Sequence, residues 1–339
     1  MDLHRHRVLL VTLVGLSLLP AACAPTKELG SVRAYSYPRQ QTDPFWWRTL
    51  VDVQGARDQG LTGNGRMVAI VDTGVLKTHE DLTSSNIVDG LEYCSAAPTT
   101  NTTDENGHGT QLAGIVLGND PTNPSTIRTT RGVAPSAKLV PFKVVCAVTK
   151  ALAVIQAVQR AAATTPPPDV ILLALGPWPG DTDSNGNVVH TLIAPFVSVN
   201  PNILFVVASV WDPTYTAVPR PAWTNYKNVI VVAGMTLDDK NKEVPFNEKG
   251  GDIWAPAQGV GTASITQDPK DASKHLQFLM PGTSAASAIV AGCAALIKEK
   301  NSGNPMYDGK ALRDALVAAV ESQPDLPGAG RLKCSMAVR

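Results

Sequence analysis

Three short segments contain, in the order Asp, His, Ser, the side chains of one kind of hydrolytic chemistry. Asp72 follows an apolar run, His108 lies between two glycines, and Ser284 begins an apolar stretch. A serine hydroxyl becomes a useful nucleophile when an imidazole takes its proton and a carboxylate fixes the tautomer of that imidazole. Each segment alone is as readily a turn or a helix cap. Together, they predict nucleophilic catalysis.

The elements that must position these side chains alternate along the chain. Unbroken apolar runs rich in Val and Ile are typical of strands covered on both faces of a parallel sheet. We expect strands at residues 67–71, 139–145, 170–175, 203–208 and 229–233, and helices at 108–117, 150–163, 285–300 and 310–321. Residues 118–131 and 177–188 are expected to be surface loops. The alternation predicts one doubly wound α/β domain, in which functional groups gather at the carboxyl ends of the strands.

Composition and the N-terminus limit the partners and the location of this protein. The 29 basic and 29 acidic residues cancel, which excludes a nucleic-acid binder that relies on a basic surface. Residues 1–24 combine a basic start, an apolar stretch at 8–19 and a small-residue zone, as a signal peptide does. That stretch is too short to span a bilayer as a helix. We therefore expect export, with lipid anchoring at Cys23 as an alternative.

The expected exported chain has four cysteines whose pairing the sequence leaves open. They are Cys94, Cys146, Cys293 and Cys334, which allow three pairings in an oxidising compartment. If residues 91–93 and 139–145 are neighbouring parallel strands, Cys94 and Cys146 both lie at carboxyl ends and could form a disulfide. Cys293 falls in an apolar helix, where a cysteine can also be a small buried hydrophobic residue.

Taken jointly, the motifs Asp-Thr-Gly at 72–74, His-Gly-Thr at 108–110 and Gly-Thr-Ser at 282–284 resemble those of the subtilisin-like serine proteases. Supporting matches occur at 79–82, 132–135, 175–176 and 254–256, so the resemblance covers about residues 46–321. It implies a mostly parallel seven-stranded sheet flanked by helices and a single catalytic domain at 46–339. It also implies peptide-bond hydrolysis through an acyl-enzyme, with Ser284 as nucleophile, His108 as general base and Asp72 orienting His108.

The chain departs from the family pattern beside the expected active site. The family places an Asn that donates a hydrogen bond to the oxyanion where this chain has Trp211, and a glycine where it has Val210. Leu175, Gly176, Ser209 and Val210 match substrate-binding positions. Residues 25–45 form a polar linker too short for an inhibitory pro-segment. We expect an endopeptidase whose turnover these changes could slow; the alternative is an inactive pseudoprotease that binds a peptide or protein partner.

The resemblance also implies which cofactors, metals and partners to expect. The reaction needs no cofactor, and we assign no metal site, although members of this family often bind structural calcium. Residues 181–186 look like the first half of a calcium loop, but position twelve is Leu192 rather than Glu. We expect a peptide or protein substrate, no transmembrane segment and a monomer.

Overall fold

The computed structural model describes residues 43–119, 131–146, 151–175, 188–209, 225–246, 251–269, 271–326 and 330–338. The expected signal peptide at 1–24, with Cys23, and most of the linker at 25–45 lie outside these ranges. So do Gly176, Val210 and Trp211, and nearly all of the loops expected at 118–131 and 177–188.

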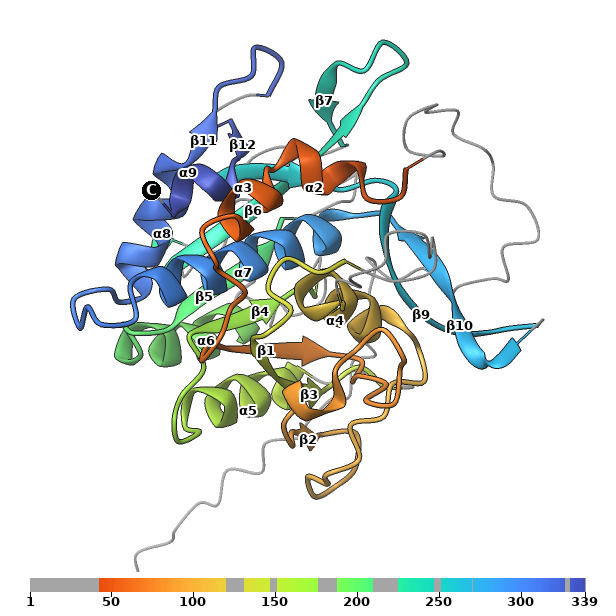
Figure 1. Ribbon diagram of the computed structural model, residues 1–339. Coiled ribbons are helices and arrows are strands. Elements are labelled where there is room, and N and C mark those ends of the chain that lie inside the picture. Colours follow the sequence, from red (N-terminus) through yellow and green to blue (C-terminus); the bar gives the residue numbers. More distant parts are fainter. Residues whose placement is uncertain are drawn as a thin grey trace, which may run out of the picture.

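A largely parallel sheet forms the centre of the molecule (Figure 1). Its parallel strands, in spatial order, are β2 (Leu91–Glu92), β3 (Lys138–Lys143), β1 (Met67–Asp72), β4 (Val170–Leu173), β5 (Leu204–Ala208), β6 (Val229–Leu237) and β8 (Ile253–Pro256). β12 (Arg331–Leu332) continues this order beside β8, and β7 (Glu243–Pro245) and β11 (Val320–Glu321) pair antiparallel at the periphery. The predicted mostly parallel sheet is confirmed; β7, β11 and β12 add to the seven strands and give a ten-stranded sheet in the described part of the chain.

Helices cover both faces of this sheet, as the doubly wound prediction requires. Successive residues of β1 show it: Val68 and Ile70 are buried in one apolar cluster, and Ala69 and Val71 in another. Figure 1 shows the helices on the two sides. The first cluster includes α4 (His108–Leu117), α7 (Thr283–Lys300) and α8 (Gly309–Ala318), and the second includes α5 (Ala151–Ala162) and α6 (Val188–Val199). The short helices α2 (Trp46–Leu50), α3 (Val53–Arg57) and α9 (Cys334–Ala337) also contribute to the first cluster, and η1 (Ser84–Asn86) precedes β2.

α7 is the helix that matters most for the site, because it runs through the protein rather than over its surface. Every residue from Thr283 to Ile297 is buried, and the helix contacts β1, β4, β5, β6 and β8. Its sequence is therefore apolar almost all round instead of amphipathic.

Some elements differ from the sequence prediction for physical reasons. β6 continues to Leu237, beyond the predicted residue 233, because its last residues pair with β7. α6 was not predicted. The helix expected at 150–163 is α5, in which Leu152 is 51% exposed and the buried stripe consists of Ala153, Val154, Ile155, Ala157, Val158 and Ala161.

A separate antiparallel hairpin, β9 (Val260–Asp268) with β10 (Asp271–Met280), was also missed. Most of β10 faces solvent, so its sequence lacks the apolar alternation of a half-buried strand. The hairpin packs on α4, where the Thr262 hydroxyl donates a hydrogen bond to the Gln111 carbonyl at 2.6 Å.

Two disulfides settle the pairing that the sequence left open. Cys94 pairs with Cys146 beside the adjacent strands β2 and β3, as their expected strand positions suggested. Cys293 pairs with Cys334, so of the two alternatives for this buried cysteine the structure shows the disulfide. The second disulfide ties the central helix α7 to the C-terminal helix α9.

Removing the Cys293–Cys334 disulfide should destabilise the protein. The bond closes a loop with a sequence separation of 41 residues. Restricting an unfolded loop of that length corresponds to about 4 kcal/mol. We expect the double substitution Cys293→Ala, Cys334→Ala to lower the free energy of unfolding by about 2–4 kcal/mol in urea titrations. An unchanged unfolding midpoint would show that the bond contributes nothing.

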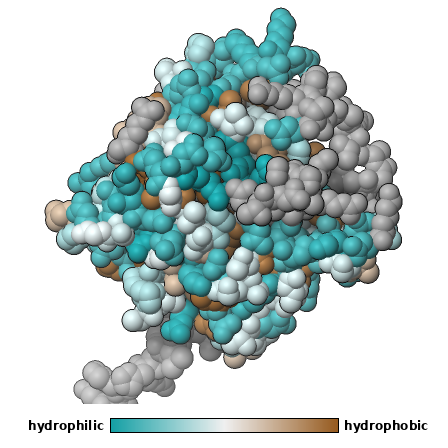
Figure 2. Space-filling view, in the orientation of Figure 1, coloured by the Kyte–Doolittle hydropathy of each residue, from teal (hydrophilic) through white to brown (hydrophobic). Residues whose placement is uncertain are grey.

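Figure 2 shows a face on which hydrophilic residues predominate and hydrophobic ones are scattered. Among the described residues, no helix is both long and apolar enough to cross a bilayer.

Candidate active site

Asp72 and His108 come together at the carboxyl end of β1. Asp72 is the last residue of the strand and is fully buried, and His108 is the first residue of α4. The Nδ1 atom of His108 lies 2.7 Å from Oδ1 of Asp72. The backbone N–H of Thr73 donates a second hydrogen bond to the same oxygen, at 2.8 Å. The pair is therefore fixed by the strand end on one side and by the helix start on the other.

The carboxylate determines which nitrogen of His108 carries the proton. An ionised carboxylate can only accept hydrogen bonds, so Nδ1 of His108 must be the donor. A neutral imidazole then has its lone pair on Nε2. This is the tautomer that can take a proton from a hydroxyl group.

Ser284 lies at the same edge of the sheet, on the first turn of α7. Its hydroxyl donates a hydrogen bond to the carbonyl oxygen of Ala174 at 3.1 Å, directly after β4. β4 pairs with β1, and Leu172 lies opposite Ile70 in the register. Ala174 and Asp72 each lie two residues further along, so both are at the carboxyl edge of the sheet. The three predicted segments therefore meet where two adjacent parallel strands end.

A network of hydrogen bonds joins the two segments that carry Asp72 and His108. The N–H of Gly109 donates to the hydroxyl of Thr73 at 2.8 Å. The N–H of Leu76 donates to the hydroxyl of Thr110 at 3.0 Å. These bonds fix the loop after β1 against the first turn of α4.

Gly109 is required by close packing within the protein. A Cβ atom at this position would lie 2.1 Å from the carbonyl oxygen of Gly74. A glycine beside a functional residue can also allow a substrate to approach the backbone closely. At Gly109, the group that approaches is the loop of Asp72.

Asp104 is a positioning residue that the sequence analysis missed. Its buried carboxylate accepts four hydrogen bonds, from the N–H groups of Asn106, Gly107 and Thr110 and from the Thr110 hydroxyl, at 2.6–3.0 Å. It thereby fixes the turn that carries His108. An Asp whose side chain can bond the N–H groups two and three residues later is a turn signal that could have revealed it.

Asp104→Asn should slow turnover while leaving substrate affinity nearly unchanged. The amide nitrogen of Asn would face donors at Thr110, so the turn should shift His108. A misplacement of about 1 Å can cost about 100-fold in rate. We expect kcat to fall about 10- to 100-fold in assays with a peptide substrate. Asp89→Asn, at a carboxylate that is 95% exposed, is the matched control and should keep full activity; equal kcat values in the two variants would contradict the assignment.

Only some of the residues expected to bind substrate can be described. The Leu175 side chain is buried in the apolar cluster beneath α5 and α6. The carbonyl of Ser209 accepts a hydrogen bond from the Thr283 hydroxyl at 2.9 Å, which places the end of β5 beside the start of α7. Gly176, Val210, Trp211 and the calcium-like segment 181–186 lie outside the described residues, so their expected roles remain predictions.

Comparisons with known proteins show the family of this chain. The model of the subtilase family matches residues 63–331. This chain belongs to the subtilase family. Subtilases of this group are serine endopeptidases, and so is this protein.

Curated relatives match this subtilase over most of its length. Subtilisin BL of Lederbergia lenta is 32% identical over 299 residues, which cover 87% of this chain and 98% of the relative. Subtilisin Savinase of the same organism is 32% identical over 297 residues, with the same coverage. Among solved structures, a protease of Pseudoalteromonas arctica superposes with a TM-score of 0.66 at 22% identity and covers 89% of this subtilase and 97% of that chain. The solved structure supports the fold alone.

Proposed function

We propose that Asp72, His108 and Ser284 act as a catalytic triad in an exported endopeptidase. The observation that carries this proposal is the hydrogen bond between Asp72 and Nδ1 of His108, which leaves the lone pair of the imidazole on Nε2. Ser284, on the first turn of α7 at the same sheet edge, supplies the hydroxyl.

The reaction divides into acylation and deacylation. In acylation, the oxygen of Ser284 forms a bond to the scissile carbonyl carbon while its proton passes to Nε2 of His108. The C–N bond then breaks, and the imidazolium gives that proton to the departing amine. In deacylation, water gives a proton to Nε2 of His108 while its oxygen attacks the ester carbon. The bond from that carbon to the Ser284 oxygen then breaks, the proton passes from His108 to that oxygen, and the acid product leaves. Asp72 stabilises the imidazolium in both halves without taking its proton.

The negative oxygen that forms on the carbonyl needs hydrogen-bond donors. N–H groups in the first turn of a helix have no intrahelical partners, and the helix dipole is positive there. The start of α7 therefore supplies part of the oxyanion site. Trp211 occupies the position of the side-chain donor in the family pattern, and an indole N–H differs from an amide in reach and direction. Loss of such a donor in a subtilisin costs about 10²–10³ in turnover.

A second candidate function rests on Val210 and Trp211. A branched side chain and an indole in place of glycine and asparagine would narrow the substrate pocket. An inactive protein with this fold could use the altered cleft to hold a peptide. The paired Asp72 and His108 favour an active enzyme, because a buried carboxylate is costly to keep and peptide binding does not require one.

Hydrolysis of casein by the purified protein distinguishes the two functions. We expect cleavage by the wild type, and we expect Trp211→Asn with Val210→Gly to increase kcat by up to about 10²–10³. The control is Phe205→Tyr with Val231→Ile, which changes two buried residues of β5 and β6. It shows how far a change in stability alone alters kcat. No cleavage by the wild type together with activity in the substituted protein would support the pseudoprotease.

Export is the remaining part of the proposal. It is supported by the basic and apolar segments within residues 1–24 and by two disulfides, which persist in oxidising compartments. Mass spectrometry of the exported protein should find an N-terminus near residue 25. A mature chain that begins at a lipid-modified Cys23 would favour anchoring, and an uncleaved chain in the cell would contradict export.

A further inference from the structure

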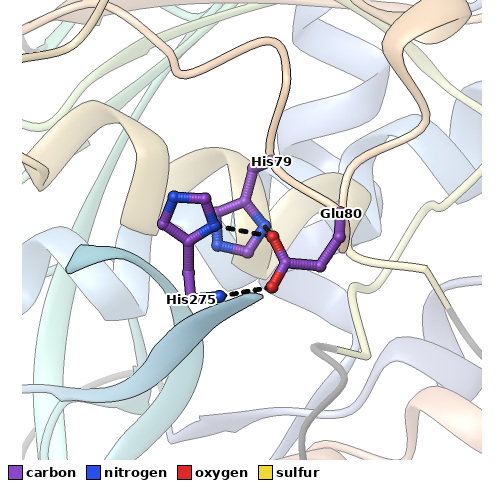
Figure 3. A group of neighbouring side chains, drawn as sticks. All are labelled: His79, Glu80 and His275. Carbon is purple, nitrogen blue, oxygen red and sulfur yellow. Dashed lines mark hydrogen bonds and ion pairs between the residues drawn. The ribbon is translucent and has the colours of Figure 1, made fainter. Parts of the chain in front are cut away.

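We propose that His79, Glu80 and His275 form a binding site for a divalent transition-metal cation such as Zn²⁺. The site lies between the loop after β1 and strand β10 (Figure 3). His79 and Glu80 come from the loop, and His275 comes from the hairpin. A bound cation would therefore link two segments that are far apart in the sequence.

The atoms that would bind the cation lie around one oxygen, Oε2 of Glu80. Oε2 of Glu80 lies 2.7 Å from Nδ1 of His275 and 3.6 Å from Nδ1 of His79. All three donor atoms lie within 4.8 Å of one another. Two ligands of a tetrahedral zinc ion lie about 3.4 Å apart when each bond is about 2.1 Å long. The separations in the protein bracket that value, so small rotations of the side chains would accommodate the ion.

His79 is already held in the tautomer that a metal bound at Nδ1 requires. Its Nδ1 accepts a hydrogen bond from the N–H of Asp81 at 3.0 Å, so its proton is on Nε2, which lies 3.0 Å from the carbonyl oxygen of Ser264. A metal-binding histidine commonly donates its other N–H to a backbone carbonyl, which fixes the ring and increases its basicity. The cation would compete with the Asp81 N–H for the Nδ1 lone pair.

Glu80 contributes a negative charge to the site, and the side chains of Glu80 and His275 are accessible to water. Both oxygens of Glu80 accept hydrogen bonds from His275, Oε2 from Nδ1 and Oε1 from the backbone N–H. The carboxylate brings a formal negative charge to the site. The cation would replace the proton that Nδ1 of His275 shares with it. The side chains of Glu80 and His275 are 22% and 14% exposed, so water can enter and complete the coordination.

The ligand types select the kind of cation. Imidazole nitrogens suit zinc, copper and nickel, whereas calcium prefers six to eight oxygen ligands. The rings of His79 and His275 stack with centroids 4.7 Å apart, which keeps both on one side of Glu80. The other described group with suitable side chains, Glu92 with Cys94 and Cys146, has its sulfur atoms in a disulfide.

Calorimetric titration of the chelator-treated full-length protein with ZnCl₂ tests the site. We expect one saturable binding event, weakened at least about 100-fold by His275→Ala and by Glu80→Gln, since even groups that merely support a ligand contribute about 10- to 100-fold. Glu80→Gln keeps the shape of the side chain, which protects the test if His275→Ala folds poorly. Absorption of bound Co²⁺ in the visible range should show the bands of a four-coordinate site and lose them in both variants.

Two controls separate this site from the other histidines. His190→Ala changes a histidine in α6, on the opposite side of the sheet, and His108→Ala changes the histidine proposed to be catalytic. Both should bind zinc as the wild type does. No saturable binding by the wild type, or equal affinity in His275→Ala and His190→Ala, would overturn the proposal. Loss of binding in His108→Ala alone would do so as well.

Discussion

Ser284→Ala should reduce peptide hydrolysis to the background of the assay, a loss on the order of 10⁶-fold, the size established for the nucleophile of a subtilisin. The substitution removes the atom that forms the acyl bond. The rest of α7 should be undisturbed, because Ser284 is buried at a position followed by two alanines. Initial rates with a chromogenic peptide, measured at several enzyme concentrations, are the appropriate readout.

Ser287→Ala is the matched control for this result. Ser287 is also a buried serine of α7, one turn further along, and its hydroxyl donates to the carbonyl of Ser284 at 2.8 Å. This variant loses the same atoms from the same helix, and we expect it to keep kcat within about tenfold, the rate equivalent of about 1.4 kcal/mol. Comparable losses in the two variants would mean that the helix, rather than the nucleophile, had been damaged.

Asp72→Asn should lower kcat about 10⁴-fold with little change in KM. The amide of Asn can donate to Nδ1 of His108, and the imidazole would then carry its proton on Nε2. That tautomer cannot accept the serine proton, and the amide nitrogen would also face the N–H of Thr73, which donates to the same oxygen in the wild type. The same change in the triad of an unrelated serine protease causes a loss of about this size.

Asp169→Asn makes the same chemical change at the other end of the same strands. Asp169 precedes β4 and accepts a hydrogen bond from the N–H of Met67 at 2.9 Å, at the amino end of β1. We expect it to alter stability and leave kcat unchanged. If Asp72→Asn retained more than about a tenth of the wild-type kcat, His108 would not depend on Asp72 for its tautomer.

The sequence predicts the parts of the fold whose physical constraints are local. The strands that flank Asp72 are buried on both faces, which requires continuous apolar runs such as that of β1. α7 is apolar nearly all round because it is covered on every side. The carboxyl ends of parallel strands share one edge, which is why the position of Asp72 follows from its place at the end of an apolar run. Ser284 follows the unpredicted strand β10, and the sequence indicated only that it begins an apolar helix.

Other features depend on contacts between distant segments and leave little local pattern. The partner of Cys293 lies in α9, and no periodicity in either helix specifies the pair. The hairpin of β9 and β10 is exposed on much of its surface, so polar residues are tolerated along it. The four hydrogen bonds to Asp104 connect a turn with a helix start, and only the turn portion has a sequence signal.

The proposed metal site also depends on contacts that leave little pattern in the sequence. It consists of His79, Glu80 and His275. The first two are adjacent, but His275 follows almost two hundred residues later, on the strand that the sequence did not predict. Without the hairpin, His275 has no recognisable setting. Only the folded structure brings these three side chains together.

Covalent labelling with a fluorophosphonate, followed by peptide mapping, tests the central claim most directly. The reagent reacts with a serine only when a neighbouring base activates it. Wild-type protein should carry one adduct per chain, on Ser284, and labelling should be absent from Ser284→Ala and much slower in Asp72→Asn. Labelling that is unchanged in Ser284→Ala, or casein cleavage by a wild type that takes no label, would contradict the proposed triad.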